Sequence, residues 1–173
     1  MAGRRLTGLI AGTLGVLILA PSISAGRQKD HPYRHSDVDM PVSLEAGTVR
    51  TPEFSVVTQW YDILVQVEKP LPFRKMQCMM GVTASPLQLK DCSSGDPLLQ
   101  GDWTVRDGEH IVDKGSSTTS ADAKFENKYI FKFLGGFVGE RGKKYVVEVK
   151  FTKDGTPLNV ANPHLIVIKH KDN

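Results

Sequence analysis

Cysteine is scarce in this 173-residue sequence, and Cys78 and Cys92 are its two residues of this type. No cysteine follows the apolar N-terminal run, which excludes the lipid-modified N-terminal cysteine of a bacterial lipoprotein. In an exported chain, two thiols so close in sequence are expected to pair, and closing a loop of about 15 residues contributes roughly 3 kcal/mol. We therefore predict a disulfide between Cys78 and Cys92.

Catalytic motifs are also missing. The sequence contains no Gly-x-Ser-x-Gly elbow, no His-Glu-x-x-His pair and no glycine-rich loop that opens a helix and could hold a phosphate. The histidines lack the spacing of a preformed metal pair. These absences predict a protein that is not an enzyme and that carries no cofactor.

Charge of one sign is not in large excess. The formal net charge is +3, and it falls to +1 if residues 1–25, which contain two arginines and no acid, are removed. Nucleic acid and anionic membrane surfaces are bound by concentrated basic patches. The near-neutral balance therefore argues against either as the main partner.

The N-terminal 25 residues have the pattern of a secretory signal peptide. Arg4 and Arg5 precede an apolar run at residues 6–20, and small residues around Ala25 offer a cleavage site. The alternative is an uncleaved membrane anchor, although the run is shorter than the roughly 20 residues that span a bilayer. We predict a periplasmic or secreted protein that contacts a membrane only through residues 1–25, if these are retained.

The remaining chain is predicted to be a flexible spacer, residues 26–40, followed by one domain at residues 41–173. The domain shows short segments of alternating apolar and polar residues with a turn signal about every ten residues, and no crossover helices. This pattern favours an all-β, Ig-like or fibronectin-III-like antiparallel sandwich of seven to eight strands.

Two aromatic residues are predicted to lie in the core of this sandwich. Tyr145 begins a long central strand at residues 142–151, where its hydroxyl can bond the upstream backbone as a tyrosine corner. Trp103 lies on the core side of a hairpin whose turn is Asp107-Gly108, which places it opposite Val112.

Other segments are assigned from local patterns. Residues 59–68 and 125–133 are predicted to be strands, the latter closed by Gly135-Gly136, and residues 76–82 a strand that enters the disulfide loop. Residues 85–90 are predicted to form one helical turn. A second hairpin is predicted at Asp154-Gly155, which would pair Phe151 with Leu158.

Several of these motifs occur together. Gly101-Asp102-Trp103, Asp107-Gly108, Gly115, residues 142–145 and residues 162–165 give the chain its pattern of turns and core aromatics. In this combination the sequence resembles an exported bacterial domain family of unassigned function, over most of residues 41–170. The resemblance implies an Ig-like β-sandwich and brings no catalytic residues with it.

Two loops are the predicted contact sites for a partner, either an envelope protein or a glycan. The first, residues 69–75, contains prolines with Phe73 and Arg74, and the second, residues 137–144, contains Phe137, Arg141, Lys143 and Lys144. The corresponding hypothesis is a non-catalytic binding module of the cell envelope. An inhibitor or immunity protein against an envelope-targeted toxin is an alternative within the same binding class.

A second alternative is a periplasmic carrier of a soft metal. Thioether and thiolate ligands suit Cu(I), and the sequence offers Met76, Met79 and Met80 around a free Cys78, with His31 or His35 as further ligands. The same strand face would serve equally well as core, where methionine is a common filler.

Overall fold

Apolar side chains at every second position build the buried faces of two inner strands, β4 (Gln59–Glu68) and β9 (Lys144–Phe151). The computed structural model describes residues 36–82, 92, 97–117, 123–126 and 128–170, and residues 33–173 form one compact unit. The predicted signal peptide and the predicted helical turn at 85–90 lie outside the described residues. In the described part, no helix is long and apolar enough to span a membrane.

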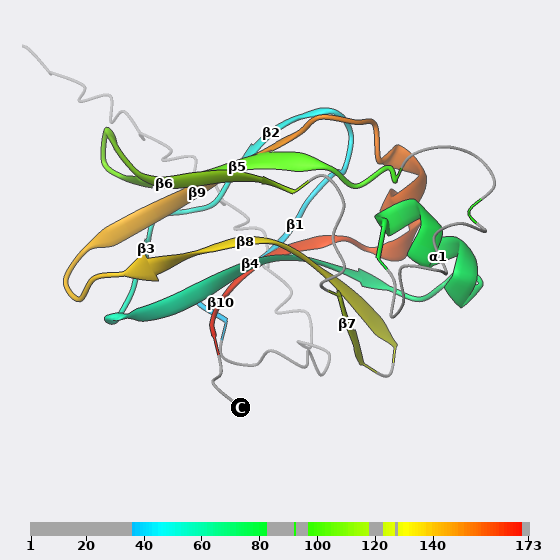
Figure 1. The fold of residues 1–173 in the computed structure, drawn as a ribbon, viewed down its shortest axis with the longest axis horizontal. Helices are drawn as coiled ribbons and strands as arrows, with labels where there is room; N and C mark the ends of the chain where they lie inside the picture. The colour runs from blue at the N-terminus through cyan, green and yellow to red at the C-terminus, as the bar shows by residue number, and fades with distance from the viewer. Residues whose placement is uncertain (1–35, 83–91, 93–96, 118–122, 127, 171–173) are drawn as a thin grey trace, which may run out of the picture. The chain divides into compact units, whose positions relative to one another are not determined.

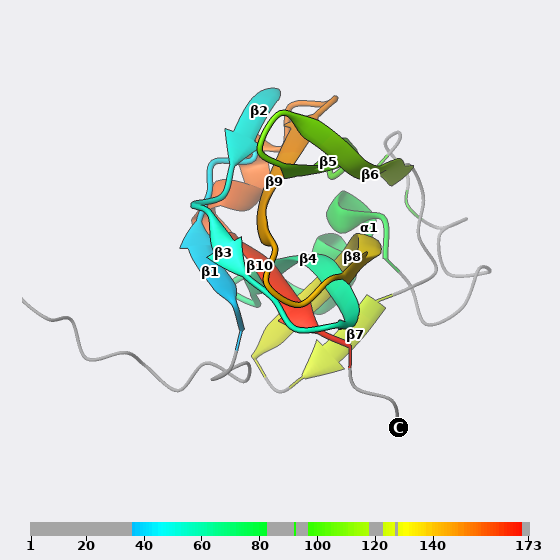
Figure 2. The ribbon, with the colours of Figure 1, turned by 90° about the vertical axis from the view of Figure 1, so that its left-hand side faces the viewer.

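The strands form two antiparallel sheets packed face to face (Figures 1 and 2). The first sheet has the order β1-β10-β4-β8-β7, and the second has the order β2-β9-β5-β6, with β3 also pairing with β9. The bounds are β1 (Val38–Pro41), β2 (Gly47–Arg50), β3 (Phe54–Ser55), β5 (Gly101–Asp107), β6 (His110–Ser117), β7 (Ala123–Glu126), β8 (Tyr129–Gly139) and β10 (His164–Lys169). The predicted all-β sandwich is confirmed, with ten described strands in place of seven to eight. β1 starts at Val38, three residues before the predicted domain boundary.

The core lies between the sheets, and Trp103 is part of it, as predicted. Glycines make room for its ring from both sides, because a Cβ atom on Gly115 or Gly135 would fall within 3 Å of the indole. Tyr145 is also buried, and its face of β9 points into the same core. A second, smaller apolar cluster of Leu64, Ile166 and Ile168 lies on the opposite, outward side of the first sheet.

The hairpin of β5 and β6 forms in a different register from the predicted one. Its two-residue turn is Gly108-Glu109, one residue later than expected, and Gly108 has φ 58°, a conformation that favours glycine. The strands also contain a bulge, so that Trp103 pairs with Gly115 instead of Val112. Turn chemistry alone did not reveal the extra residue.

Residues 125–133 are not one strand, and the predicted hairpin at Asp154-Gly155 does not form. β7 ends at Glu126 and pairs with β8, which runs through Gly135 and Gly136 to Gly139. β9 is followed by the 3₁₀ helix η1 (Thr156–Ala161), and the chain returns as β10 in the other sheet. The first error arises because the apolar pattern does not reveal the turn between β7 and β8, which are neighbours in one sheet, and the second because a turn motif does not say which sheet the next strand joins.

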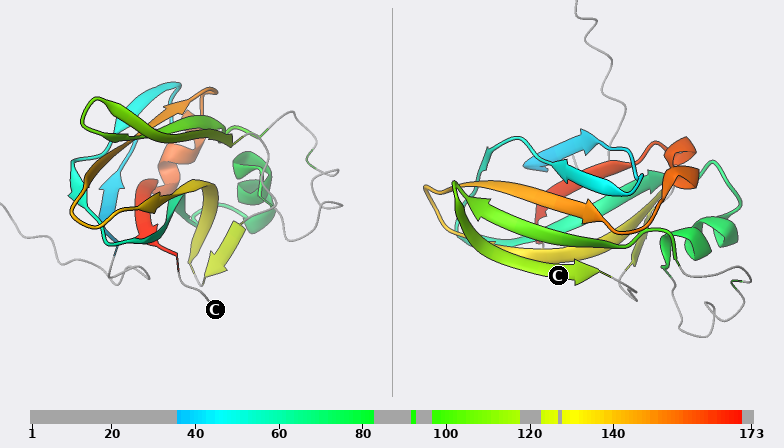
Figure 3. Two further views of the ribbon diagram at one scale, coloured as in Figure 1. Left: turned by 60° about the vertical axis from the view of Figure 1, so that its left-hand side comes forward. Right: turned by 90° about the horizontal axis from the view of Figure 1, so that it is seen from above.

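The segment predicted as a strand at residues 76–82 is part of helix α1 (Phe73–Met80). The helix follows Pro72, contains no β-branched residue, and ends at Gly81 with φ 69°. Gly81 N–H donates to the Cys78 carbonyl and Val82 N–H donates to the Gln77 carbonyl. These are the two hydrogen bonds of a Schellman C-cap. Figures 1 and 3 show α1 at the end of the sandwich opposite the β8–β9 turn.

Candidate functional site

The connection from β8 to β9 crosses from the first sheet to the second, and buried tyrosines fix its backbone and that of the connection between β3 and β4. The Tyr145 hydroxyl accepts a hydrogen bond from Glu140 N–H at 3.2 Å, and the Tyr61 hydroxyl accepts one from Val57 N–H at 3.0 Å. The tyrosine corner at Tyr145 therefore uses an upstream N–H donor. Burial raises the pKa of Tyr61, which keeps this phenol neutral at physiological pH. We call the end of the sandwich formed by the β8–β9 connection and the β3–β4 connection the corner end.

An exposed apolar surface lies beside this connection, and we call it the Trp60 patch, consisting of Trp60 and Val138. Trp60 on β4 and Val138 on β8 are directly paired on the outward face of the first sheet. Their side chains are 43% and 54% exposed. The Trp60 indole lies over Gly136, where an added Cβ would come within 2.8 Å of the ring. The absence of a side chain at Gly136 thus lets the ring lie against the sheet.

Polar groups hold the indole in place. Trp60 Nε1–H donates to Asp62 Oδ1 at 3.0 Å, and Asp62 Oδ2 is 2.8 Å from His170 Nδ1. The Gln59 side-chain amide donates to the His170 carbonyl, and His170 N–H donates to the Trp60 carbonyl. The arrangement is an ordered aromatic side chain surrounded by polar groups. Exposed aromatic residues with a polar rim are typical of the residues that contribute most of the binding energy at protein interfaces.

The predicted contact residues 141–144 belong to the corner end next to the Trp60 patch. Arg141 is exposed, and its N–H donates to Thr58 Oγ1 at 3.1 Å, which ties the two loops together. Lys143 pairs with Asp107 at 2.7 Å and Lys144 with Glu53 at 2.9 Å. Hydrogen bonds to these carboxylates raise the pKa of both lysines, so both remain charged.

Phe137 does not belong to this surface. It was predicted at the start of an exposed loop, but it lies inside β8 and is fully buried. Its ring stacks on Tyr61 at 5.5 Å and contacts Tyr145 at 5.4 Å between centroids. The inward position follows from strand alternation, because the neighbouring Val138 is the exposed residue.

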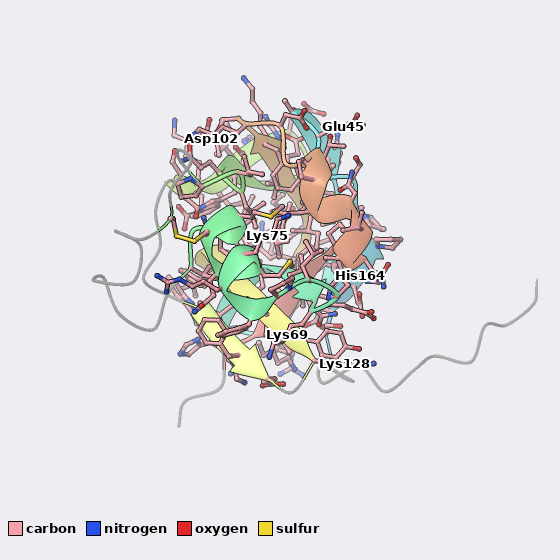
Figure 4. The ribbon with its side chains drawn as sticks, turned by 90° about the vertical axis from the view of Figure 1, so that its right-hand side faces the viewer. Glu45, Lys69, Lys75, Asp102, Lys128 and His164 are labelled. Atoms are coloured by element: carbon pink, nitrogen blue, oxygen red, sulfur yellow. A yellow bond between two sulfur atoms is a disulfide. The ribbon has the colours of Figure 1, made fainter. Side chains whose placement is uncertain are left out.

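The other predicted contact residues, Phe73 and Arg74, start α1 at the opposite end of the sandwich. Phe73 is exposed and makes an edge contact with the Phe125 ring at 5.3 Å, while Lys69 Nζ lies 5.3 Å from the Phe73 ring centre. Figure 4 views this end, with Lys75 on the helix and Lys69 near it. The two predicted loops are therefore separate surfaces and cannot form one site.

The methionine cluster is not arranged as the soft-metal alternative requires. Met76 and Met80 lie on one side of α1 in the main core, whereas Met79 is only partly buried. Cys78 is bonded to Cys92, with 5.5 Å between their Cα atoms, which confirms the predicted disulfide and removes the thiolate. His31 and His35 lie outside the described residues, among which no three His, Cys, Asp or Glu side chains gather as a metal site.

One buried group was missed by the sequence reasoning. The side chain of Lys132 on β8 is 0% exposed, and its Nζ donates to the carbonyls of Met80 at 2.9 Å and Leu99 at 2.5 Å. Burial lowers the pKa of Lys132 to about 8. A signal existed, because Lys132 shares its strand face with Ile130 and Leu134.

Comparison with known proteins bears on the fold of this chain. No protein-family model and no curated protein matches it. The chain is similar to a crystal structure of a protein from Sulfurospirillum deleyianum, with a TM-score of 0.54 and 10% sequence identity. The match covers 78% of this chain and 98% of that one. At this identity, the likeness establishes a shared fold.

Proposed function

We propose that this protein is an exported, non-catalytic binding module of the cell envelope, and that it contacts a partner protein through the Trp60 patch. The observation that carries the proposal is the exposed Trp60 indole, held against Gly136 and by Asp62 next to the exposed Val138. An exposed tryptophan that is already ordered loses little side-chain entropy on binding. Tryptophan and arginine are also the residue types most common at interface hot spots, and Arg141 lies in the adjoining loop.

The disulfide supports the export part of the proposal. Disulfides persist in oxidising compartments and are rare in the cytosol, and the described cysteines Cys78 and Cys92 are joined. The sequence pattern of residues 1–25 is independent support for the same route. An inhibitor or immunity protein would be one kind of binding module and would use the same surface.

Affinity capture from envelope extracts tests the proposal. The purified domain should retrieve a stoichiometric partner, and Trp60→Ala should weaken that complex about 30-fold or more, the loss typical of a tryptophan hot spot. Val160→Ala is the matched control, because Val160 is 68% exposed but belongs to η1. It should leave the affinity unchanged.

Two further variants separate the surfaces. Arg141→Ala should weaken the complex in the same direction as Trp60→Ala, because both residues belong to the corner end. Phe73→Ala should not, because Phe73 lies at the opposite end. Equal recovery of the partner by the wild type and Trp60→Ala would refute the Trp60 patch, and recovery of no stoichiometric partner would refute the function.

A further inference from the structure

At the end of the sandwich that α1 covers, the buried ammonium group of Lys132 donates its described hydrogen bonds to backbone carbonyls and to no carboxylate. Lys132 Nζ binds Met80 O, at the last residue of α1, and Leu99 O, just before β5. The Schellman bonds leave the Met80 carbonyl without a partner from the cap itself, so the lysine provides its donor. Lys132 thus joins three segments: β8, the end of α1 and the residues before β5.

The surroundings of Lys132 are apolar. Its strand neighbours are Val65 on β4 and Ala123 on β7, and Gly81 and Pro97 lie on the side of the helix. In the described part of the chain, the acidic, basic and histidine side chains of the elements that pack around it, β4, β5, β6, β7 and α1, are all at least partly exposed: Asp62, Glu68, Arg74, Lys75, Asp102, Arg106, Asp107, His110, Asp113, Lys114, Lys124 and Glu126. Burying an ammonium ion in such a place costs free energy that hydration in an opened state would recover.

We propose that Lys132 couples the closure of this end to protons: opening of α1 and residues 97–99 away from β8 takes up a proton on Lys132, and closing releases it. The neutral amine keeps two N–H donors, enough for the two carbonyls, so closing without the proton removes the charge and retains both hydrogen bonds. The ammonium form, in contrast, is hydrated only when the end is open.

The sign of the pH dependence follows from linkage. The closed-state pKa of Lys132 is lowered to about 8, whereas the opened, hydrated side chain has the ordinary value of 10.5. Below about pH 8 both states are protonated, and the opening equilibrium does not change with pH. Between about pH 8 and 10.5 only the open state holds the proton, so the fraction open falls about tenfold per pH unit. Alkaline conditions close this end and neutral conditions loosen it.

Opening of α1 would move a surface that was predicted from the sequence to contact a partner. Phe73 and Arg74 form the first turn of α1, and the Cys78–Cys92 disulfide connects the same helix to the chain beyond it. A helix that opens changes the position of these side chains. The inference does not depend on the Trp60 patch, which lies at the other end.

Native-state trypsin cleavage measures the opening directly. Lys75 is exposed on α1, and cutting after it requires the helix to unfold locally. The new N-terminus at Met76 is counted by mass spectrometry from pH 7 to 10. The control is Lys132→Gln, whose side-chain amide offers two N–H donors and no titratable charge. The ratio of the wild-type rate to the Lys132→Gln rate should be constant up to about pH 8 and then fall about tenfold per pH unit.

Two additional measurements keep the outcome decisive. Lys132→Met should give the same flat reference, although with faster cleavage, because both carbonyls lose their donor. If neither variant folds, the wild-type rate is divided by the rate for a short unstructured peptide that carries the same site, and this ratio must fall above about pH 8. A ratio that is flat or rises over this range overturns the proposal.

Discussion

At each end of the sandwich, backbone polar groups need a hydrogen-bond partner from a side chain, and the two ends use opposite chemistry. At the corner end, backbone N–H groups of Glu140 and Val57 need acceptors, and the hydroxyls of Tyr145 and Tyr61 supply them. At the end covered by α1, backbone carbonyls need donors, and the buried ammonium of Lys132 supplies them. A neutral phenol costs little to bury when it is hydrogen-bonded, whereas an ammonium is costly even then. The comparison teaches that the α1 end should respond to pH between about 8 and 10.5.

Removal of the disulfide should have the largest effect, and it should act on the α1 end. Replacing both Cys78 and Cys92 with alanine removes a cross-link between residues 14 positions apart, which should lower the free energy of unfolding by roughly 3 kcal/mol. Urea unfolding measures the loss, and trypsin cleavage after Lys75 should become faster. A loss below about 1 kcal/mol would show that the cross-link does not hold this end together.

Removal of a corner hydroxyl should have a smaller effect. Tyr145→Phe deletes the acceptor of Glu140 N–H and should lower the free energy of unfolding by about 1 kcal/mol. Tyr61→Phe, which frees Val57 N–H, should behave similarly. The Tyr61→Phe loss should not vary with pH between about 6 and 9, since burial raises the pKa of Tyr61 above its ordinary value of about 10. A pH-dependent loss in this range would remove the contrast between the two ends.

Truncation of the exposed indole should have the smallest effect on folding. Trp60→Ala removes a partly exposed side chain and one hydrogen bond to Asp62, so the free energy of unfolding should change by about 0.5 kcal/mol or less. Thermal unfolding measures this change. A much larger loss would mean that Trp60 serves the sheet itself, and the proposed contact surface would have to be assigned elsewhere.

Strand alternation in the sequence was enough to predict much of the core. Apolar residues fill every second position of both strands, Tyr61 to Val67 in β4 and Tyr145 to Phe151 in β9, so these inward faces were predicted correctly. The disulfide followed from the spacing of two cysteines. Strand partners were harder to predict, because β9 and β10 lie in different sheets although a turn motif separates them. A turn signal reports local backbone geometry and does not report where the chain goes next.

The site was predicted less well than the fold. Met76, Cys78 and Met80 alternate as in a strand, but Met76 and Met80 are also four residues apart, as on a helix face. Eight residues are too few to decide between these periods. Trp60 was not predicted because its strand was assigned from the residues of its buried face. Lys132 was not predicted because one lysine in an apolar strand leaves the assignment of the strand unchanged. Its two partners, Met80 and Leu99, come from distant parts of the chain, and only the folded structure brings them together.

Direct titration of Lys132 in the folded protein is the most direct test of the contrast between the two ends. The ¹³Cε resonance of this lysine, assigned by comparison with Lys132→Gln, can be followed from pH 6 to 11. A buried ammonium predicts a midpoint near pH 8. A midpoint at the ordinary lysine value, about 10.5, would mean that the charge is hydrated and would contradict the account of the α1 end.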